Sequence, residues 1–146
     1  MDELITLKVV DDPNPEDIAL LEARVADATA QSTGHDRADE RQLAIFVRDA
    51  DDSIRAGIYG WTWGGCCELQ HLWVSERERG RGLGNRLLDA AEAEAIRRGC
   101  RQVVLFTHAA NAGADGDRYT RRGYELVGRV DDYPAGDAAL WYRKHL

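Results

Sequence analysis

Apolar residues recur along the chain with two different periods, and each period predicts a different kind of element. Residues 4–10, 43–48, 54–63 and 66–74 alternate or run apolar in short stretches bounded by turn residues, which is typical of β-strands. The pair Gly64-Gly65 supplies a tight turn between the last two stretches. We therefore expect one early strand and, after an intervening segment, a meander of three antiparallel strands.

Two longer stretches instead place apolar residues three or four positions apart, as one face of an α-helix requires. Asn14 can cap the first of these helices, and Pro15 fits its first turn. The apolar stripes are Ile18, Leu21, Val25 and Ala28 in the first helix and Leu83, Leu87, Leu88, Ala91, Ala95 and Ile96 in the second. The sequence thus predicts helices over residues 15–30 and 83–98, the second of which ends at Gly99.

The last third of the chain predicts a strand over residues 102–108, a short helix over 115–122, and strands over 124–130 and 138–143. Strands that precede a strand–helix–strand crossover indicate a mixed sheet with helices on both faces. We therefore expect an α/β fold of mixed α+β character, with a mostly antiparallel sheet of about seven strands, in one domain that spans residues 1–146.

A glycine-rich segment, Arg79-Gly80-Arg81-Gly82-Leu83-Gly84, lies between the third strand of the meander and the second helix. Glycines let the backbone approach an anion, and a helix N-terminus offers unpaired N–H groups to it. The spacing fails the dinucleotide fingerprint at its third glycine, and the segment lacks the lysine of a nucleotide P-loop. The segment therefore predicts a phosphate-binding loop of another type.

The pattern Arg-x-x-Gly-x-Gly, from Arg79 to Gly84, resembles the coenzyme A pyrophosphate loop of the GNAT superfamily of N-acetyltransferases. Downstream, Arg118-Tyr119-Thr120-Arg121-Arg122-Gly123-Tyr124 is similar to the superfamily signature Phe-Tyr-x-x-x-Gly-Phe. The likeness is specific over residues 66–130, and the order of elements agrees with the GNAT fold. The resemblance implies an enzyme that uses acetyl-CoA as cosubstrate to acetylate a primary amine by direct attack.

The resemblance also implies which residues hold acetyl-CoA. A bulge near the end of the strand before the loop would expose a backbone N–H to the thioester carbonyl. A fixed donor to a developing oxyanion contributes about 3 kcal/mol. Asn111 would lie near the pantetheine arm, although it stands eight residues before Tyr119 where the family often has seven. The cofactor-binding residues expected are Leu72, Trp73, Val74, Arg79, Gly80, Arg81, Gly82, Leu83, Gly84, Asn111 and Tyr119.

The catalytic residues expected are Glu68 and Tyr119, which the resemblance implies, and His71, which the chemistry of its imidazole suggests. An acceptor amine with a pKa near ~10.4 is protonated at neutral pH and must lose a proton before it attacks. Glu68 has the family's spacing for the general base, whereas His71 is a rival that ideal alternation puts on the opposite face unless a bulge intervenes. Tyr119 matches the general acid near the coenzyme A sulfur, and its alternative role is to anchor the short helix.

The acceptor is less defined: a small-molecule or peptide amine. Tyr59, Trp61 and Trp63 share one face of a strand and could cover a cationic amine or simply pack against a helix. Loop residues in two places, namely His35 with Asp36 and Tyr133 with Asp131 and Asp132, lie where family members shape specificity. The alternative function is a non-catalytic acyl-CoA-binding module, which would need neither a base nor an acid.

Charge and composition narrow the partners. The formal net charge of −7 disfavours nucleic acid and favours a cationic substrate. No apolar run could span a membrane, and the acidic N-terminus lacks a signal peptide, so we expect a cytoplasmic protein. Cys66, Cys67 and Cys100 match no metal-ligand spacing, so no metal is expected. Family members are often dimers, and the sequence leaves a homodimer open.

Overall fold

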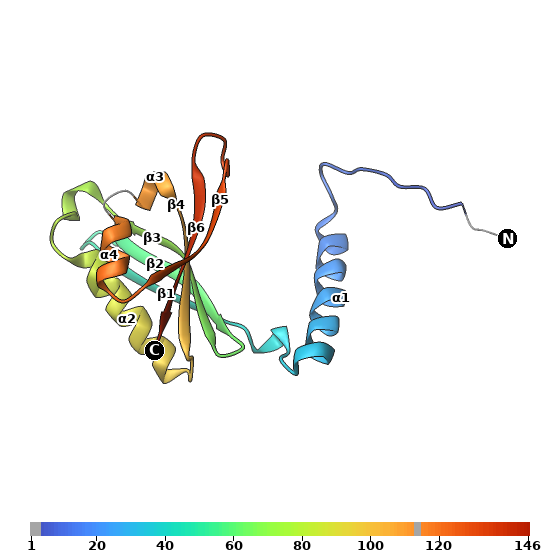
Figure 1. Ribbon diagram of the computed structural model, residues 1–146, viewed down its shortest axis with the longest axis horizontal. Coiled ribbons are helices and arrows are strands. Elements are labelled where there is room, and N and C mark those ends of the chain that lie inside the picture. Colours follow the sequence, from blue (N-terminus) through green and yellow to red (C-terminus); the bar gives the residue numbers. More distant parts are fainter. Residues whose placement is uncertain (1–3, 113–114) are drawn as a thin grey trace. The chain divides into compact units, whose positions relative to one another are not determined.

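The computed structural model describes residues 4–112 and 115–146, and the chain forms two compact units, Met1–Ala38 and Asp39–Leu146. The first unit contains helix α1 (Pro15–Thr33) (Figure 1). The Asn14 side chain accepts a hydrogen bond from the Glu16 N–H at 3.0 Å, and Gly34 ends the helix with a φ of 77°. The predicted cap is confirmed, and the helix runs three residues past the predicted end at residue 30.

The expected strand over residues 4–10 is wrong, because these residues form no strand. Their alternating pattern satisfies only half of what a strand needs, since a strand also requires a neighbour to pair its backbone N–H and C=O groups. The first unit offers one helix and no strand as a partner over its described residues. The sheet therefore has six strands instead of about seven.

The second unit is built on that six-stranded sheet, in the order β1-β2-β3-β4-β6-β5 (Figure 1). Only the β3–β4 pair is parallel; the other neighbours are antiparallel, so the mixed, mostly antiparallel sheet is confirmed. The strands are β1 (Arg41–Arg48), β2 (Ile54–Trp63), β3 (Cys66–Val74), β4 (Gln102–His108), β5 (Glu125–Asp131) and β6 (Ala138–His145). The helices around them are η1 (Arg37–Asp39), η2 (Glu76–Glu78), α2 (Leu83–Arg97), α3 (Ala109–Ala112) and α4 (Asp115–Arg121).

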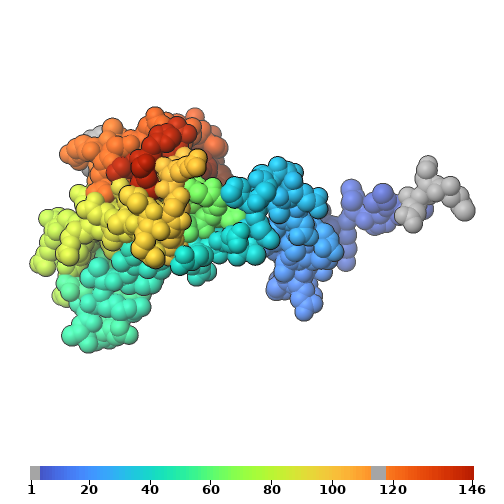
Figure 2. All heavy atoms as spheres, turned by 90° about the horizontal axis from the view of Figure 1, so that it is seen from below, coloured from blue at the N-terminus to red at the C-terminus, as the bar shows by residue number. Residues whose placement is uncertain are grey.

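Helix α2 packs its apolar stripe on one face of the sheet, against β2 and β3 above all. Leu88, Ala91 and Ala95 are buried there with Ile58 and Val103 of the sheet. The Leu146 N–H donates to the Arg101 carbonyl at 2.9 Å, which extends the β4–β6 pairing by one step. Figure 2 shows the dark red C-terminal strand beside the yellow-orange segment that follows α2. Burial of this stripe is the main stabilising term that holds α2 in place.

A buried polar cluster fixes α2 to the C-terminal strands and to α4. The Glu92 carboxylate of α2 accepts hydrogen bonds from the Tyr124 hydroxyl at 3.1 Å, Lys144 Nζ at 2.5 Å and Arg122 Nη2 at 2.8 Å. Burial and the neighbouring carboxylate raise the pKa of Tyr124. Because a buried charge is tolerated only when it is paired, these contacts determine how α2, α4 and β6 meet.

The central irregularity of the sheet is a bulge in β3. Tyr59 pairs with His71 and Gly60 with Leu69, so Gln70 is an extra residue opposite β2. On its other side, β3 pairs with β4 only as far as Leu69, opposite Leu105. Beyond this point the two parallel strands separate, and the second half of β3 keeps β2 as its neighbour.

Candidate functional site

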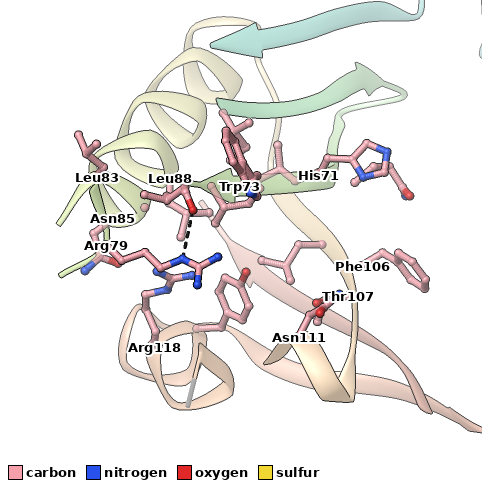
Figure 3. Close-up of a pocket in the computed structure, with 18 of the residues that line it drawn as sticks. His71, Trp73, Arg79, Leu83, Asn85, Leu88, Phe106, Thr107, Asn111 and Arg118 are labelled. Carbon is pink, nitrogen blue, oxygen red and sulfur yellow. Dashed lines mark hydrogen bonds between the residues drawn. The ribbon is translucent and has the colours of Figure 1, made fainter. Parts of the chain in front are cut away.

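A cavity of about 980 Å³ lies where β3 and β4 separate (Figure 3). Its walls come from the second half of β3, the glycine-rich loop, the first turn of α2, the end of β4, α3 and α4. His71 and Phe106 lie at one end, and Arg79 and Arg118 at the other (Figure 3). The expected site residues that line it are His71, Leu72, Trp73, Val74, Arg79, Gly80, Gly82, Leu83, Gly84, Asn111 and Tyr119.

The glycine-rich loop presents the start of α2 to the cavity. Gly80 and Gly82 have φ values of 79° and 76°, which side chains with a Cβ rarely adopt. Gly82 is the N-cap of α2 and contributes no side-chain cap, and the first turn of α2 contains no acidic residue. The N–H groups of this turn are therefore left for an anion, which the helix dipole also favours.

Two arginines fix the loop to the strands. Arg79 Nε donates to the Val74 carbonyl at 3.2 Å, so the loop is tied to the last residue of β3 (Figure 3). Beneath it, Arg55 of β2 forms a very short ion pair with the buried Glu78 of η2, and this contact lowers the pKa of Glu78. Arg81 also turns to Glu78, with 3.5 Å between Nη1 and Oε2, and it is not among the described residues that line the cavity.

The bulge decides where the candidate bases point. Without it, Glu68 and His71 would lie on opposite faces, but Glu68 pairs with Trp61 and His71 with Tyr59, and both partners share one face of β2. The rings of His71 and Tyr59 stack with 6.2 Å between centroids. The bulge thus brings the two candidate bases to the same face.

Glu68 and His71 differ in their access to the cavity. His71 is exposed and lines it, whereas Glu68 is half-buried and is not among the described lining residues. The Glu68 carboxylate accepts a hydrogen bond at 2.6 Å from Nε2 of Gln70, the bulged residue, and Gln70 does line the cavity. Glu68 therefore approaches the site through Gln70, and its role as the base stays a prediction.

The position of Tyr119 fits both roles that the sequence left open, and its role as the general acid stays a prediction. Tyr119 is only 6% exposed, and its ring contacts those of Tyr124 at 6.0 Å and Tyr142 at 5.5 Å, so it does anchor α4 in the core. It also lines the cavity. A buried phenol in this wall suits a proton donor whose geometry is held by packing.

The segment around Asn111 is irregular, as its composition predicts. Helix α3 contains only four residues and is separated from α4, and residues 113–114 lie outside the described residues. The Asp137 carboxylate of the β5–β6 turn accepts from the Ala110 N–H at 3.0 and 3.2 Å, which holds α3 at the cavity wall. Asn111 is the next residue of α3 after Ala110, and it lines the cavity (Figure 3).

Several residues that the sequence patterns did not indicate also line the cavity, among them Gln70, Asn85, Thr107, His108 and Arg118. His108 is the most chemically distinctive, because its Nδ1 lies 3.0 Å from the Tyr133 carbonyl oxygen. A carbonyl can only accept, so Nδ1 carries the proton, and Nε2 of the neutral ring keeps its lone pair. The position of His108 at the carboxyl end of a buried strand was the available signal.

The residues that were expected to bind the acceptor amine do not all lie at the cavity. Tyr59 and Trp61 share a face, with their rings edge to face at 6.2 Å, but neither is among the described residues that line the cavity. Tyr133 stacks on His108 at 6.0 Å and so reaches the cavity wall. His35 and Asp36 belong to the first unit, and their role stays a prediction.

The three cysteines are free thiols. Burial raises the pKa of each thiol, that of Cys67 to about 12. None of the three therefore offers the thiolate that would be needed to form an acyl-cysteine intermediate. Among the described residues, no group of three or more His, Cys, Asp or Glu side chains could hold a metal ion. None of the described helices is long and apolar enough to cross a membrane.

Comparison with known proteins gives a consistent result. The model of the acetyltransferase (GNAT) family matches residues 3–124. The acetyltransferase Atu2258 of Agrobacterium fabrum is 32% identical over 131 residues, which are 82% of this chain and 93% of that protein. Blasticidin-S acetyltransferase of Streptomyces morookaense is 38% identical over 105 residues, 67% of this chain and 73% of that protein. A crystal structure of an acetyltransferase-family protein from Agrobacterium tumefaciens superposes with a TM-score of 0.84 at 28% identity, covering 97% of this chain and 100% of that one.

Proposed function

The chain belongs to the GNAT acetyltransferase family, and we propose that it transfers the acetyl group of acetyl-CoA to a primary amine of a small molecule or peptide. Acetyltransferases of this family use acetyl-CoA as the donor. The observation that carries the proposal is the meeting of the glycine-rich loop, the open edge of β3 and Tyr119 in one cavity. The amine attacks the thioester directly, and no covalent enzyme intermediate forms.

The donor is held from its diphosphate to its thioester. The N–H groups at the start of α2 and the Arg79 guanidinium bind the diphosphate. The pantetheine arm follows β3 past Leu69, where the strand has no partner on its β4 side. A backbone N–H in the Leu72–Val74 stretch then donates to the thioester carbonyl and stabilises the oxyanion by about 3 kcal/mol.

Proton transfer completes the reaction. The acceptor enters as an ammonium, and a base on the His71 side of the cavity removes its proton so that the nitrogen lone pair can attack the carbonyl carbon. Glu68 is our first assignment for this base, acting through the Gln70 contact, and His71 is the second. When the tetrahedral intermediate collapses, the carbon–sulfur bond breaks and Tyr119 gives its proton to the leaving thiolate. The Tyr119 oxygen then takes up the second proton that the new amide nitrogen loses, so the phenol is restored.

A thiol-release assay tests the function. Purified protein is mixed with acetyl-CoA and each of a panel of amines, namely blasticidin S, spermidine, lysine and a peptide that begins with alanine, and free coenzyme A is read with a thiol reagent. We expect amine-dependent thiol release, with the acetylated amine confirmed by mass spectrometry. Blasticidin S is included because of the name of one relative. Tight acetyl-CoA binding without release on any amine would favour the non-catalytic binding module.

A cytoplasmic location and a homodimer stay predictions.

A further inference from the structure

Arg118 lies against the first turn of α2, although it belongs to α4. Its Nη1 is 2.6 Å from the position that a Cβ on residue 84 would take, so the guanidinium occupies space that only glycine leaves open at that position. Arg118 lines the cavity together with Arg79, Gly82 and Gly84. Figure 3 shows Arg79 and Arg118 extending toward the same end of the cavity from two different sides.

This arrangement gathers positive charge at one point. The start of α2 is the positive end of a helix dipole, and cations are unfavourable there unless an anion lies between them. No acidic residue stands in the first turn of α2, and the nearby Glu78 is already bound by Arg55 and Arg81. Two guanidinium groups and a helix N-terminus that converge on a cavity favour a ligand with at least two negative charges.

The sequence departs from the family signature at the same residue. The position before Tyr119 is phenylalanine in the Phe-Tyr-x-x-x-Gly-Phe pattern, and it is Arg118 here. The Arg118 guanidinium stacks over the Tyr119 ring at 5.5 Å, which holds its stem to the cavity wall. A planar guanidinium donates two parallel hydrogen bonds to phosphate oxygens, which an apolar side chain at this position could not do.

We propose that Arg118 is a specificity residue that binds the diphosphate of coenzyme A opposite Arg79, an inference that rests on the proposed function. The acyl donor is then held from both sides, by the loop after β3 and by α4. The consequence is a preference for coenzyme A thioesters over donors with a single phosphate, such as the 4′-phosphopantetheine arm of carrier proteins. Arg118 thereby sets which class of acyl carrier the cavity accepts.

Calorimetric titration of coenzyme A and of 4′-phosphopantetheine as its methyl ester, a phosphodiester with one negative charge as in carrier proteins, tests this proposal. Arg118→Met keeps the stem length and removes the charge, and Arg121→Met is the matched control on the same helix, since Arg121 is exposed and is not among the described lining residues. We expect Arg118→Met to weaken coenzyme A binding by about 10- to 100-fold, as loss of a hydrogen bond to a charged group does. Binding of the 4′-phosphopantetheine methyl ester should change by less than about threefold, and Arg121→Met should change neither.

A second variant tests the geometry without replacing Arg118. Gly84→Ala adds a Cβ where the guanidinium lies, and alanine is the better helix former, so the fold should tolerate it. We expect weaker coenzyme A binding in Gly84→Ala alone and little further loss when it is added to Arg118→Met. Independent, additive losses would show that residue 84 contacts the ligand by itself and would count against the proposal.

The outcomes separate this inference from the proposed function. Wild-type protein that does not bind coenzyme A would overturn both. Wild-type binding that Arg118→Met leaves unchanged would overturn only the role of Arg118. An equal loss for coenzyme A and the 4′-phosphopantetheine methyl ester would assign Arg118 to the packing of α4, and it would likewise overturn the specificity role.

Discussion

Gly60 of β2 lies so close to β3 that a Cβ on it would stand 1.9 Å from the carbonyl oxygen of Glu68. This approach occurs opposite the bulge at Gln70, where the register between the two strands shifts by one residue. The absence of a side chain at position 60 is therefore a condition for the bulge. The bulge in turn places His71 beside the cavity and lets β3 leave β4.

Gly60→Ala should destabilise the protein, because the new methyl group meets backbone that cannot rotate away. We expect a loss of about 2–4 kcal/mol in the free energy of unfolding, which lowers the melting temperature by roughly 5–15 °C. Thermal unfolding measures it. Gly57→Ala on the same strand is the control. Its Cβ would crowd the side chain of the exposed Phe46 at 2.8 Å, which can turn away, and would meet the Ile45 carbonyl oxygen at an ordinary contact distance of 3.4 Å. Equal melting temperatures for the two variants would contradict this account of the bulge.

Gly82→Asp should abolish acetyl-CoA binding, because it adds a strained side chain and a negative charge where the diphosphate is expected to lie. We expect affinity to fall by at least about 100-fold in calorimetry. Gly64→Asp in the β2–β3 turn is a matched control: its φ is also positive, at 60°, and it is not among the described lining residues. Unchanged affinity in folded Gly82→Asp would remove the loop from the binding site.

Tyr119→Phe should lower kcat on an identified amine by about 100-fold and leave acetyl-CoA affinity nearly intact, because only the proton donor is lost. The buried ring and its contacts with Tyr124 and Tyr142 are kept. Tyr142→Phe is the control, since Tyr142 is packed in the same cluster and is not among the described residues of the cavity wall. Wild-type kcat in Tyr119→Phe would assign Tyr119 to packing alone.

The pH dependence of turnover should identify the base. A general base works only when deprotonated, so the rate rises with pH through the pKa of that group and then levels off. We expect Glu68→Gln to lower kcat and change this acidic limb, and His71→Asn to have the smaller effect. If the result is the reverse, His71 is the base. If the acidic limb of the pH–rate profile is unchanged in both variants, neither residue is the base. His108 is then the next candidate, because its contact with the Tyr133 carbonyl leaves the Nε2 lone pair available. The other explanation is that the amine loses its proton before it binds.

Tyr124 should make the protein less stable in strong base. Its pKa is raised in the folded state by burial and by Glu92, so the unfolded chain loses this proton first as pH rises through about 10. The contribution of this group is present below that pH and falls by up to about 1.4 kcal/mol per pH unit above it. Denaturant unfolding at pH 8 to 11 should show a shallower decline for Tyr124→Phe than for wild type. Parallel declines would mean that Tyr124 ionises equally in both states.

Local features of the sequence were enough to predict much of the second unit. Alternation located β1, β2 and β3, helical periodicity located α2, and glycine spacing located the loop between them. These predictions succeed because each element depends on residues close together in the chain: caps, turns, and a face of regular period. The same reasoning gave an early strand over residues 4–10 that does not form, because its other requirement, a pairing partner, is not local.

The composition of the cavity was decided by the tertiary structure. Motif spacing identified Arg79, Gly82 and Tyr119, which lie where chain-local patterns already point. Arg118 of α4 and His108 at the end of β4 line the cavity. Arg81 pairs with Glu78 instead and is not among the described lining residues. The sequence by itself determined the main elements of the second unit and the glycine-rich loop between β3 and α2. Which side chains meet around it followed from one bulge, one strand separation and the buried contacts of Glu92, all of which join residues far apart in the chain.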